Sequence, residues 1–128
     1  MKLTNEEEIS EWAYNQCLNK KDTIQMRRLI TKSWWVYLYC LNVKDIKEMW
    51  SKINNSFDAC RYCYYIKDRK EVLRNITESD LSYWFCKKVK NSLEVRKYIT
   101  ESRDTYWYCE DVKDRPEVRR YIKNETNR

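Results

Sequence analysis

Cysteine is the most reactive residue type in this chain, and Cys60 and Cys63 form its single C-x-x-C motif. Such a pair can hold half of a tetrahedral zinc site or act as a redox couple. The 128-residue sequence contains no histidine, which removes a common further zinc ligand and the commonest general base for a nucleophilic cysteine. We therefore expect a protein that is not an enzyme, with no catalytic residues, no metal site and no cofactor.

Most of the cysteines belong to an internal repeat. Five of the six lie 23 residues apart, and serine, lysine and isoleucine recur in the same register. The four columns are Cys17, Cys40, Cys63, Cys86 and Cys109; Ser10, Ser33, Ser56, Ser79 and Ser102; Lys21, Lys44, Lys67, Lys90 and Lys113; and Ile30, Ile53, Ile76, Ile99 and Ile122. A fixed period of this kind is the signature of a repeat architecture. The sequence predicts a single domain over residues 1–128, with repeats at about 10–32, 33–55, 56–78, 79–101 and 102–124, an N-terminal cap at 1–9 and a polar tail at 125–128.

Each repeat carries the signals of two short helices, as the last repeat illustrates. Ser102 is predicted to be the N-cap of a first helix of about ten residues, which the lysine column would end. Asp114, followed three residues later by Glu117, is predicted to form a capping box that starts a second helix of about eight residues. A further capping box beginning at Thr4 predicts that the first helix of the chain starts before the first serine.

The apolar residues of each repeat are predicted to bury one face of each helix. Tyr106, Cys109 and Val112 share a face of the first helix, and Val118 and Ile122 share a face of the second. With no glycine and a single proline in the chain, turns that need a positive φ lack their usual residue. We expect an all-α fold in which the hairpins stack as a right-handed α-solenoid. Cysteines at equivalent points would then lie roughly 10 Å apart, too far for disulfides, and would serve as packing thiols.

Charge and hydropathy allow several kinds of partner. The formal net charge of +6 permits attraction to nucleic acid, acidic membranes or acidic proteins, and requires none of them. No apolar run approaches the roughly 18 residues of a membrane span. We expect a cytoplasmic protein that does not enter a membrane.

The last repeat has a recognisable pattern, carried by Asp104, Tyr106, Tyr108, Val112, Arg115, Glu117 and Ile122. It resembles the short tandem helical-hairpin repeats, of the kind D-x-Y-x-Y-A-x-x-V-x-x-R-x-x-E-x-x-x-I, in proteins of uncharacterised function from phages, large DNA viruses and mobile elements. The resemblance covers nearly the whole chain, with cysteine where that pattern often has alanine. It implies a viral or phage-derived helical repeat protein, acting in the host cell cytoplasm, and implies no particular activity.

Binding is the function that remains, and the outward positions of the first helices are the candidate surface. The residues expected to contact a protein partner are Leu38, Arg61, Tyr65, Trp84, Lys88 and Trp107. Three aromatic residues near helix starts could extend this surface or fill gaps between repeats: Trp34, Trp35 and Phe57. Exposed Trp84 and Trp107 would be interface anchors; the alternative is that both pack against adjacent hairpins. By analogy with the viral repeats, the partner could be a host defence effector, as for an anti-CRISPR inhibitor.

Two other functions stay open. Arg28, Arg74, Lys97 and Arg120, with Arg27, Arg96 and Arg119 beside them, form a ladder of cations on the second helices that could bind the phosphates of a nucleic acid. Glutamates three residues before the last three ladder members offer them ordinary intrahelical pairing instead. Self-assembly by end-to-end stacking is the third hypothesis, because the last repeat lacks an obvious polar cap.

Overall fold

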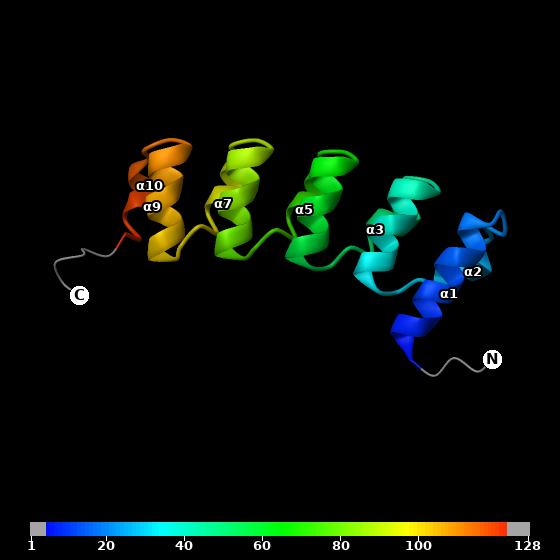
Figure 1. Ribbon diagram of the computed structural model, residues 1–128. Helices are drawn as coiled ribbons and strands as arrows, with labels where there is room; N and C mark the ends of the chain where they lie inside the picture. The colour runs from blue at the N-terminus through cyan, green and yellow to red at the C-terminus, as the bar shows by residue number, and fades with distance from the viewer. Residues whose placement is uncertain (1–4, 123–128) are drawn as a thin grey trace. The chain divides into compact units, whose positions relative to one another are not determined.

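The structure is a computed structural model that describes residues 5–122. All regular secondary structure in this range is helical, which confirms the all-α class (Figure 1). The helices are α1 (Glu6–Leu18), α2 (Ile24–Leu29), α3 (Ser33–Asn42), α4 (Lys47–Trp50), α5 (Ser56–Tyr65), α6 (Lys70–Leu73), α7 (Ser79–Lys88), α8 (Leu93–Arg96), α9 (Ser102–Asp111) and α10 (Pro116–Arg119). The predicted polar tail lies outside the described residues.

The helices fall into two compact units. Helices α1 to α6 belong to an N-terminal unit that ends at Asn75, and α7 to α10 belong to a C-terminal unit that begins at Ile76. Each long helix packs against the short helix that follows it. Within the N-terminal unit α1 packs against α3 and α3 against α5, and within the C-terminal unit α7 packs against α9. Consecutive long helices of a unit therefore lie side by side.

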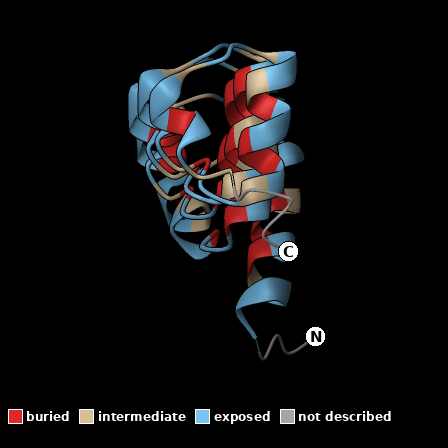
Figure 2. Cartoon of the chain, turned by 90° about the vertical axis from the view of Figure 1, so that its left-hand side faces the viewer, coloured by how far each residue is buried: buried red, intermediate tan, exposed pale blue. Residues whose placement is uncertain are grey.

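The core of each hairpin lies where the long and the short helix face each other (Figure 2). The second helices contribute Met49, Val72, Val95 and Val118, and the turns that follow them contribute Ile30, Ile53, Ile76 and Ile99, all buried. The long helices contribute Ala13, Val36, Ala59, Ser82 and Thr105, which have no exposed surface. The buried face predicted for the second helices is therefore confirmed at these positions, whereas Ile122 is half-buried.

The buried face predicted for the first helices needs correction in the last repeat. Tyr106 is 51% exposed, whereas Tyr108, two residues on, is fully buried. Val112 is half-buried and forms the C-cap of α9 rather than part of its inner face. The equivalent of Tyr106 in the first repeat, Tyr14, is buried and packs against the ring of Trp35 on the next long helix, at a centroid distance of 5.6 Å. This position is thus buried by the neighbouring hairpin.

The long helices α3, α5, α7 and α9 have the predicted ten residues and end without glycine. Their C-cap residue is valine or isoleucine in a right-handed conformation, as at Val43 with φ −111° and ψ −67°. The backbone N–H of Lys44 then bonds to the carbonyl of Tyr39, 3.1 Å away. Only Lys20, in the described range, adopts a positive φ of 70°. The lysine column therefore follows the helix end, and its backbone, not its charge, closes the last turn.

The short helices are shorter than predicted. Four of them have four residues and α2 has six. The chain leaves the α-helical pattern early because its last turn closes by tighter bonds to residues three positions back, as from Ile53 N–H to the carbonyl of Trp50 at 3.2 Å. This tightening accompanies burial of the isoleucine that follows the helix, as at Ile53.

The prediction that the serine column forms the N-caps of the first helices is wrong. In α3, α5, α7 and α9 it is the first helical residue, and Lys32, Asn55, Glu78 and Glu101 occupy the N-cap position. The Ser79 hydroxyl instead accepts hydrogen bonds from the backbone N–H groups of Thr100 at 3.1 Å and Glu101 at 3.0 Å. Ser10 accepts equivalent bonds from Thr31 and Lys32. Serine thus ties the start of its own helix to the segment that enters the next hairpin.

Helix α1 begins before Ser10, as predicted, but its cap is Asn5, whose side chain accepts from the Glu8 N–H at 2.8 Å. The predicted cap Thr4 lies outside the described residues.

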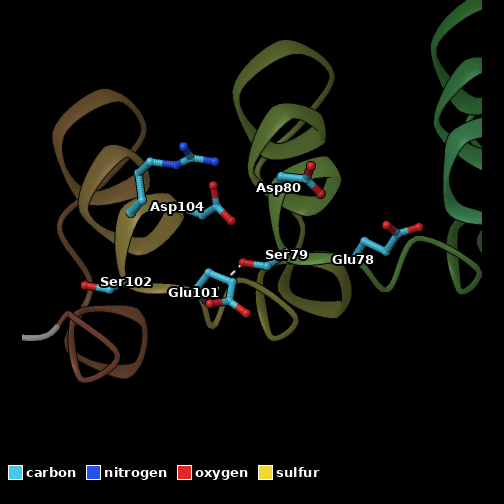
Figure 3. A pocket seen from close by; sticks show the side chains of 7 residues that line it. Glu78, Ser79, Asp80, Glu101, Ser102 and Asp104 are labelled. Carbon is cyan, nitrogen blue, oxygen red and sulfur yellow. Dashed lines mark hydrogen bonds between the residues drawn. The ribbon is translucent and has the colours of Figure 1, made fainter.

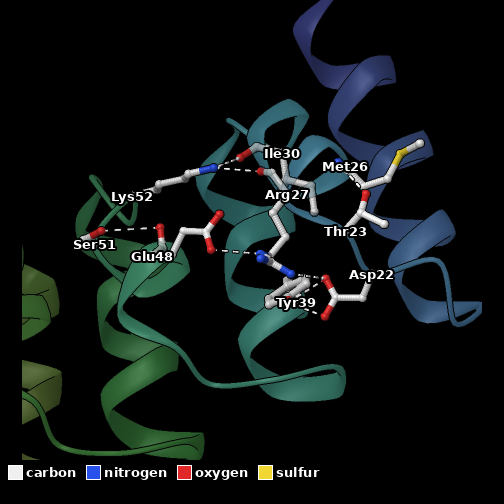
Figure 4. Close-up of polar contacts among 9 residues, drawn as sticks. All are labelled: Asp22, Thr23, Met26, Arg27, Ile30, Tyr39, Glu48, Ser51 and Lys52. Carbon is white, nitrogen blue, oxygen red and sulfur yellow. Dashed lines mark hydrogen bonds and ion pairs between the residues drawn. The ribbon is translucent and has the colours of Figure 1, made fainter.

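The residues that precede the second helices at the position of Asp114, such as Asp22, Asp45 and Asn91, have a different role from the predicted capping box. The N-cap of α4 is Ile46, one residue after Asp45, and Asp45 instead accepts a hydrogen bond of 2.7 Å from the Tyr62 hydroxyl on the next long helix. Tyr62 is fully buried, and Arg69 bonds to both the phenol and the carboxylate. Asp22 accepts likewise from Tyr39 and pairs with Arg27, which also pairs with Glu48 (Figure 4). In the C-terminal unit Asn91 accepts from Tyr108 at 2.7 Å.

A lysine completes the network around α2. Lys52 Nζ donates to the carbonyls of Arg27 at 2.8 Å and Ile30 at 3.1 Å, at the C-terminal end of α2 (Figure 4). Burial lowers the pKa of Lys52. The cation satisfies carbonyls that a helix end leaves without a partner, and it joins two neighbouring hairpins of the N-terminal unit.

Removal of one phenol hydroxyl should weaken the contact between hairpins. We expect Tyr62→Phe to lower the free energy of unfolding by about 1 to 2 kcal/mol, because Asp45 and Arg69 lose a buried hydrogen-bonding partner. Tyr65→Phe is the matched control, because Tyr65 lies on the same helix with 63% of its surface exposed, and it should leave the free energy unchanged. Urea denaturation followed by circular dichroism measures both; equal stability of the two variants would contradict the assigned role.

The pH dependence of unfolding tests the same contact. Burial, and next the hydrogen bond to Asp45, raise the pKa of Tyr62. The phenol therefore ionises in the unfolded chain near pH 10 and in the folded chain only at higher pH. Its contribution is fully present below pH 10 and is lost as the pH rises above it. Tyr62→Phe should lose less stability than the wild type between about pH 10 and pH 11.

Candidate interaction surfaces

All the cysteines except the half-buried Cys109 are buried in their own hairpins. Cys63 Sγ lies 4.0 Å from the carbonyl oxygen of Arg69, the N-cap of α6, and Cys86 Sγ lies at the same distance from that of Ser92, the N-cap of α8. Cys60, the other member of the C-x-x-C motif, is also buried. Residues 5–122 hold no group of three or more His, Cys, Asp or Glu side chains that could bind a metal ion. The geometry is that of packing residues.

The thiols are also poorly ionised. Burial raises the pKa of Cys17 to about 11, of Cys40 to about 12 and of Cys86 to about 11, and in each case a backbone hydrogen bond offsets part of the rise. Burial raises the pKa of Cys109 as well. Because the thiolate is the nucleophile, these cysteines are unreactive at neutral pH.

The outward face of α3 and α5 in the N-terminal unit carries an aromatic cluster around one arginine. The Arg61 guanidinium carbon lies 5.2 Å from the ring centroid of Trp34 and 5.5 Å from that of Phe57. Arg61 also pairs with the buried carboxylate of Asp58 at 3.2 Å. Tyr65 lies one turn further along α5 and is highly exposed. We call Trp34, Phe57, Arg61 and Tyr65 the N-terminal aromatic surface.

The C-terminal unit carries a second cluster, between α7 and α9. The Trp107 ring is 41% exposed and is flanked by the ring of Tyr83 at 6.0 Å and by the guanidinium carbon of Arg103 at 5.2 Å. The Tyr83 hydroxyl donates to Asp111 at 2.6 Å, and Lys87 lies 3.5 Å from the same carboxylate. We call Tyr83, Lys87, Arg103, Trp107 and Asp111 the C-terminal aromatic surface.

These contacts shift the pKa values of the groups that make them. Burial, with a further contribution from the Asp111 hydrogen bond, raises the pKa of Tyr83, and the same bond lowers the pKa of Asp111. At neutral pH the phenol therefore keeps its proton and donates it in the hydrogen bond, and the carboxylate stays ionised and accepts it. This bond holds the tyrosine ring against Trp107.

The predicted partner-binding residues occupy several environments. Arg61 and Tyr65 share α5, and Trp107 is exposed on α9 with partial cover from Tyr83 and Arg103. Leu38 and Trp84 are half-buried, and Lys88 is exposed at the end of α7. Sequence reasoning missed Tyr83, Lys87 and Arg103. Their signal was spacing, since Arg103 precedes Trp107 by four residues and Lys87 follows Tyr83 by four, which places each pair on one helix face.

The basic ladder is exposed and largely without acidic partners. Arg28, Arg74, Lys97 and Arg120 are all exposed. Glu117 pairs with Arg96 at 3.6 Å and Arg115 at 3.9 Å, not with Arg120. The intrahelical pairing considered for the ladder is therefore not observed within residues 5–122.

The three arginines beside the ladder are engaged in the structure instead. Arg27 pairs with Asp22 and Glu48, Arg96 with Glu117, and Arg119 with Asp114.

No helix within residues 5–122 is both long enough and apolar enough to cross a lipid bilayer.

The thiols should react slowly while the protein is folded. At pH 8 we expect Ellman's reagent to label all six cysteines rapidly in denaturant, and to label the native chain far more slowly, because the buried thiols are shielded. For Cys17 and Cys86, a pKa near 11 also leaves about a hundredfold less thiolate than an ordinary thiol. Peptide mapping should find Cys109, which is only half-buried, labelled first. Rapid native labelling of Cys60 or Cys63 would contradict a packing role for the motif.

Comparison of the chain with protein-family models, with curated protein sequences and with solved structures found no match. Function must therefore be inferred from the surfaces themselves.

Proposed function

We propose that the chain is a non-enzymatic helical repeat protein that binds another protein through its exposed aromatic and arginine side chains. The five sequence repeats would form a right-handed α-solenoid. Support comes from the columns of identical residues across all five repeats, and from the side-by-side packing of consecutive long helices within each unit. Repeats of this kind commonly present extended binding surfaces.

The observation that carries the proposal is the pairing of exposed aromatic rings with cations on the outward face of the long helices. Aromatic residues and arginine are enriched in the central, energetically dominant contacts of protein interfaces. Single exposed apolar side chains are ordinary, but clusters such as the two aromatic surfaces are the kind that mark interaction sites. Both clusters are held in place by polar contacts: Asp58 pairs with Arg61, and Asp111 accepts a hydrogen bond from Tyr83.

The resemblance to viral and phage repeats suggests a class of partner. A stoichiometric inhibitor of a host defence effector, such as an anti-CRISPR protein, would need a binding surface and no active site. We propose the host cytoplasm as its place of action, where a reducing environment suits a chain with buried thiols. This step rests on analogy of sequence pattern alone.

The aromatic surfaces can be tested by substitution. We expect Tyr65→Ala combined with Trp107→Ala to reduce capture of the protein partner at least tenfold, because truncation of interface anchors typically costs more than 1 kcal/mol each. Leu93→Ala is the matched control, because Leu93 is an exposed apolar residue on α8. Quantitative pull-down from nuclease-treated lysate measures capture, and circular dichroism measures folding. Unchanged capture of the partner, or a large decrease in melting temperature, would contradict the assignment of these residues to a binding surface.

A second candidate, nucleic-acid binding, is favoured by the basic ladder. Lys97 Nζ lies 5.3 Å from the ring of Tyr98, and the guanidinium carbon of Arg120 lies 4.8 Å from the ring of Tyr121. Cations next to rings are the elements with which proteins hold single strands, by phosphate contact and by base stacking.

Salt dependence distinguishes this candidate from protein binding. Neutralisation of Arg28, Arg74, Lys97 and Arg120 to glutamine should abolish nucleic-acid binding at low salt and flatten its dependence on salt concentration, because phosphate contacts release counterions. A charge-matched control changes four exposed members of the lysine column, Lys21, Lys44, Lys67 and Lys113. Fluorescence anisotropy with labelled single- and double-stranded DNA and RNA measures binding. Absence of binding by the wild type at low salt would dismiss this candidate.

A further inference from the structure

A groove of about 680 Å³ lies in the C-terminal unit between the beginnings of α7 and α9 (Figure 3). Its lining includes four carboxylates, from Glu78, Asp80, Glu101 and Asp104, and one cation, from Arg103. The groove is therefore acidic, in a protein whose overall charge is +6.

One of these carboxylates is buried without a partner. Asp104 is only 3% exposed, and its Oδ1 accepts no hydrogen bond. Figure 3 shows its carboxylate pointing from α9 into the space toward α7. The third residue of a helix is a tolerated place for an acid because of the helix dipole, but a buried oxygen without a donor still costs folding free energy.

The same position two repeats earlier shows what such a carboxylate binds. Asp58 in α5 is equally buried, with 4% exposure. Its carboxylate accepts from the Asn55 side chain at 2.7 Å and from the Arg61 guanidinium at 3.2 Å. Arg61 in turn lies over the rings of Trp34 and Phe57, and these residues line a groove of about 510 Å³ with Asn55 and Asp58. There the chain supplies its own guanidinium.

Both donors are replaced in the last repeat. Glu101 stands at the position of Asn55, and Trp107 stands at the position of Arg61. Arg103 lies over the Trp107 ring, and within residues 5–122 no ion pair joins Arg103 to Asp104. The carboxylate has been kept, its donors have been lost, and the neighbouring side chains have become acidic.

We propose that this groove receives an arginine side chain of the protein partner, whose guanidinium takes the place that Arg61 fills beside Asp58. The inference rests on the proposed function and names one contact through which it acts. A guanidinium fits because it is planar, always charged and offers several N–H donors, which can serve Asp104 and the groove acids together. The negative potential of Glu78, Asp80 and Glu101 favours the entry of a cation.

The test uses a pair of probes of nearly equal size and shape, of which only one carries the charged guanidinium. An acetylated, amidated Gly-Arg-Gly peptide and its citrulline analogue, which replaces guanidinium by neutral urea, are titrated into the ¹⁵N-labelled full chain. We expect the arginine peptide to shift the amide resonances of residues 78–80 and 101–104, and the citrulline peptide to leave them unchanged. Equal shifts from both peptides, or none from either, would overturn the proposal.

Variants of the groove sharpen the outcome. Asp104→Asn should weaken binding of the arginine peptide about tenfold or more, and should raise the melting temperature, because a buried charge without a partner is removed. Glu110→Gln, an exposed charge-matched change on α9, should alter neither. An Asp104→Asn chain that binds the peptide like the wild type, or that melts lower or fails to fold, would contradict the proposal.

A second variant rebuilds the arrangement of the earlier repeat. Glu101→Asn with Trp107→Arg supplies the two donors that Asp58 uses, so it should raise the melting temperature and abolish peptide binding; retained binding would overturn the proposal. Failure of the groove and failure of the proposed function are separable. A wild-type chain that captures a protein but not the arginine peptide refutes the groove alone, and a chain that binds the peptide but captures no protein supports the groove and refutes the function.

Discussion

The fold depends on one buried hydrogen bond that joins each hairpin to the one before it within a unit. A phenol such as that of Tyr62 buries its ring in the core and must find a partner for its hydroxyl, which Asp45 supplies from the preceding turn. Apolar packing alone tolerates small changes of register, whereas this bond has a fixed length and direction. Asn91 performs the same task for Tyr108 without a charge. The hydrogen bond from the phenol is therefore the same in both units, whether its acceptor is the charged Asp45 or the neutral Asn91.

Because the inward columns fix the frame, the outward positions are free to differ from repeat to repeat. Asp58 and Asp104 show the consequence: the same carboxylate in the same place on its helix is satisfied inside the chain in one repeat and left without a donor in another. A repeat protein can in this way keep a stable scaffold while individual grooves take on different chemistry. Real proteins tend to break local rules at functional sites, and a buried, unpaired carboxylate in a groove is such a break.

Much of the fold could be predicted from the sequence, since the 23-residue period, the ten-residue first helices and the buried isoleucines follow from periodicity. The role of the polar columns could not. Serine at a helix start serves as a cap or as a bridge to a distant backbone, and only the structure shows that Ser79 bonds to the segment 21 and 22 residues later. Tyr106 and Tyr108 lie about 200° apart around a helix, so the sequence requires one to face outward without saying which. The groove at Asp104 could not be predicted from the sequence, because the sequence does not show that Asn55 and Arg61 are the hydrogen-bonding partners of Asp58.

The buried phenol bond between hairpins also has a direction: for Tyr39, Tyr62 and Tyr108 the donor comes from the later repeat and the acceptor from the earlier one. Every 23-residue repeat carries Asp or Asn at the acceptor position, and three of the five carry the tyrosine donor, since Gln16 and Phe85 stand at that position in the other two. Insertion or deletion of a whole block inside a unit leaves every remaining donor with an acceptor, as expected where each repeat interacts only with its neighbours. An insertion or deletion of any other length within the 17 positions between an acceptor and its donor changes their spacing. A change of length by whole repeats therefore preserves the contact, and gene duplication is the natural way for such a chain to grow.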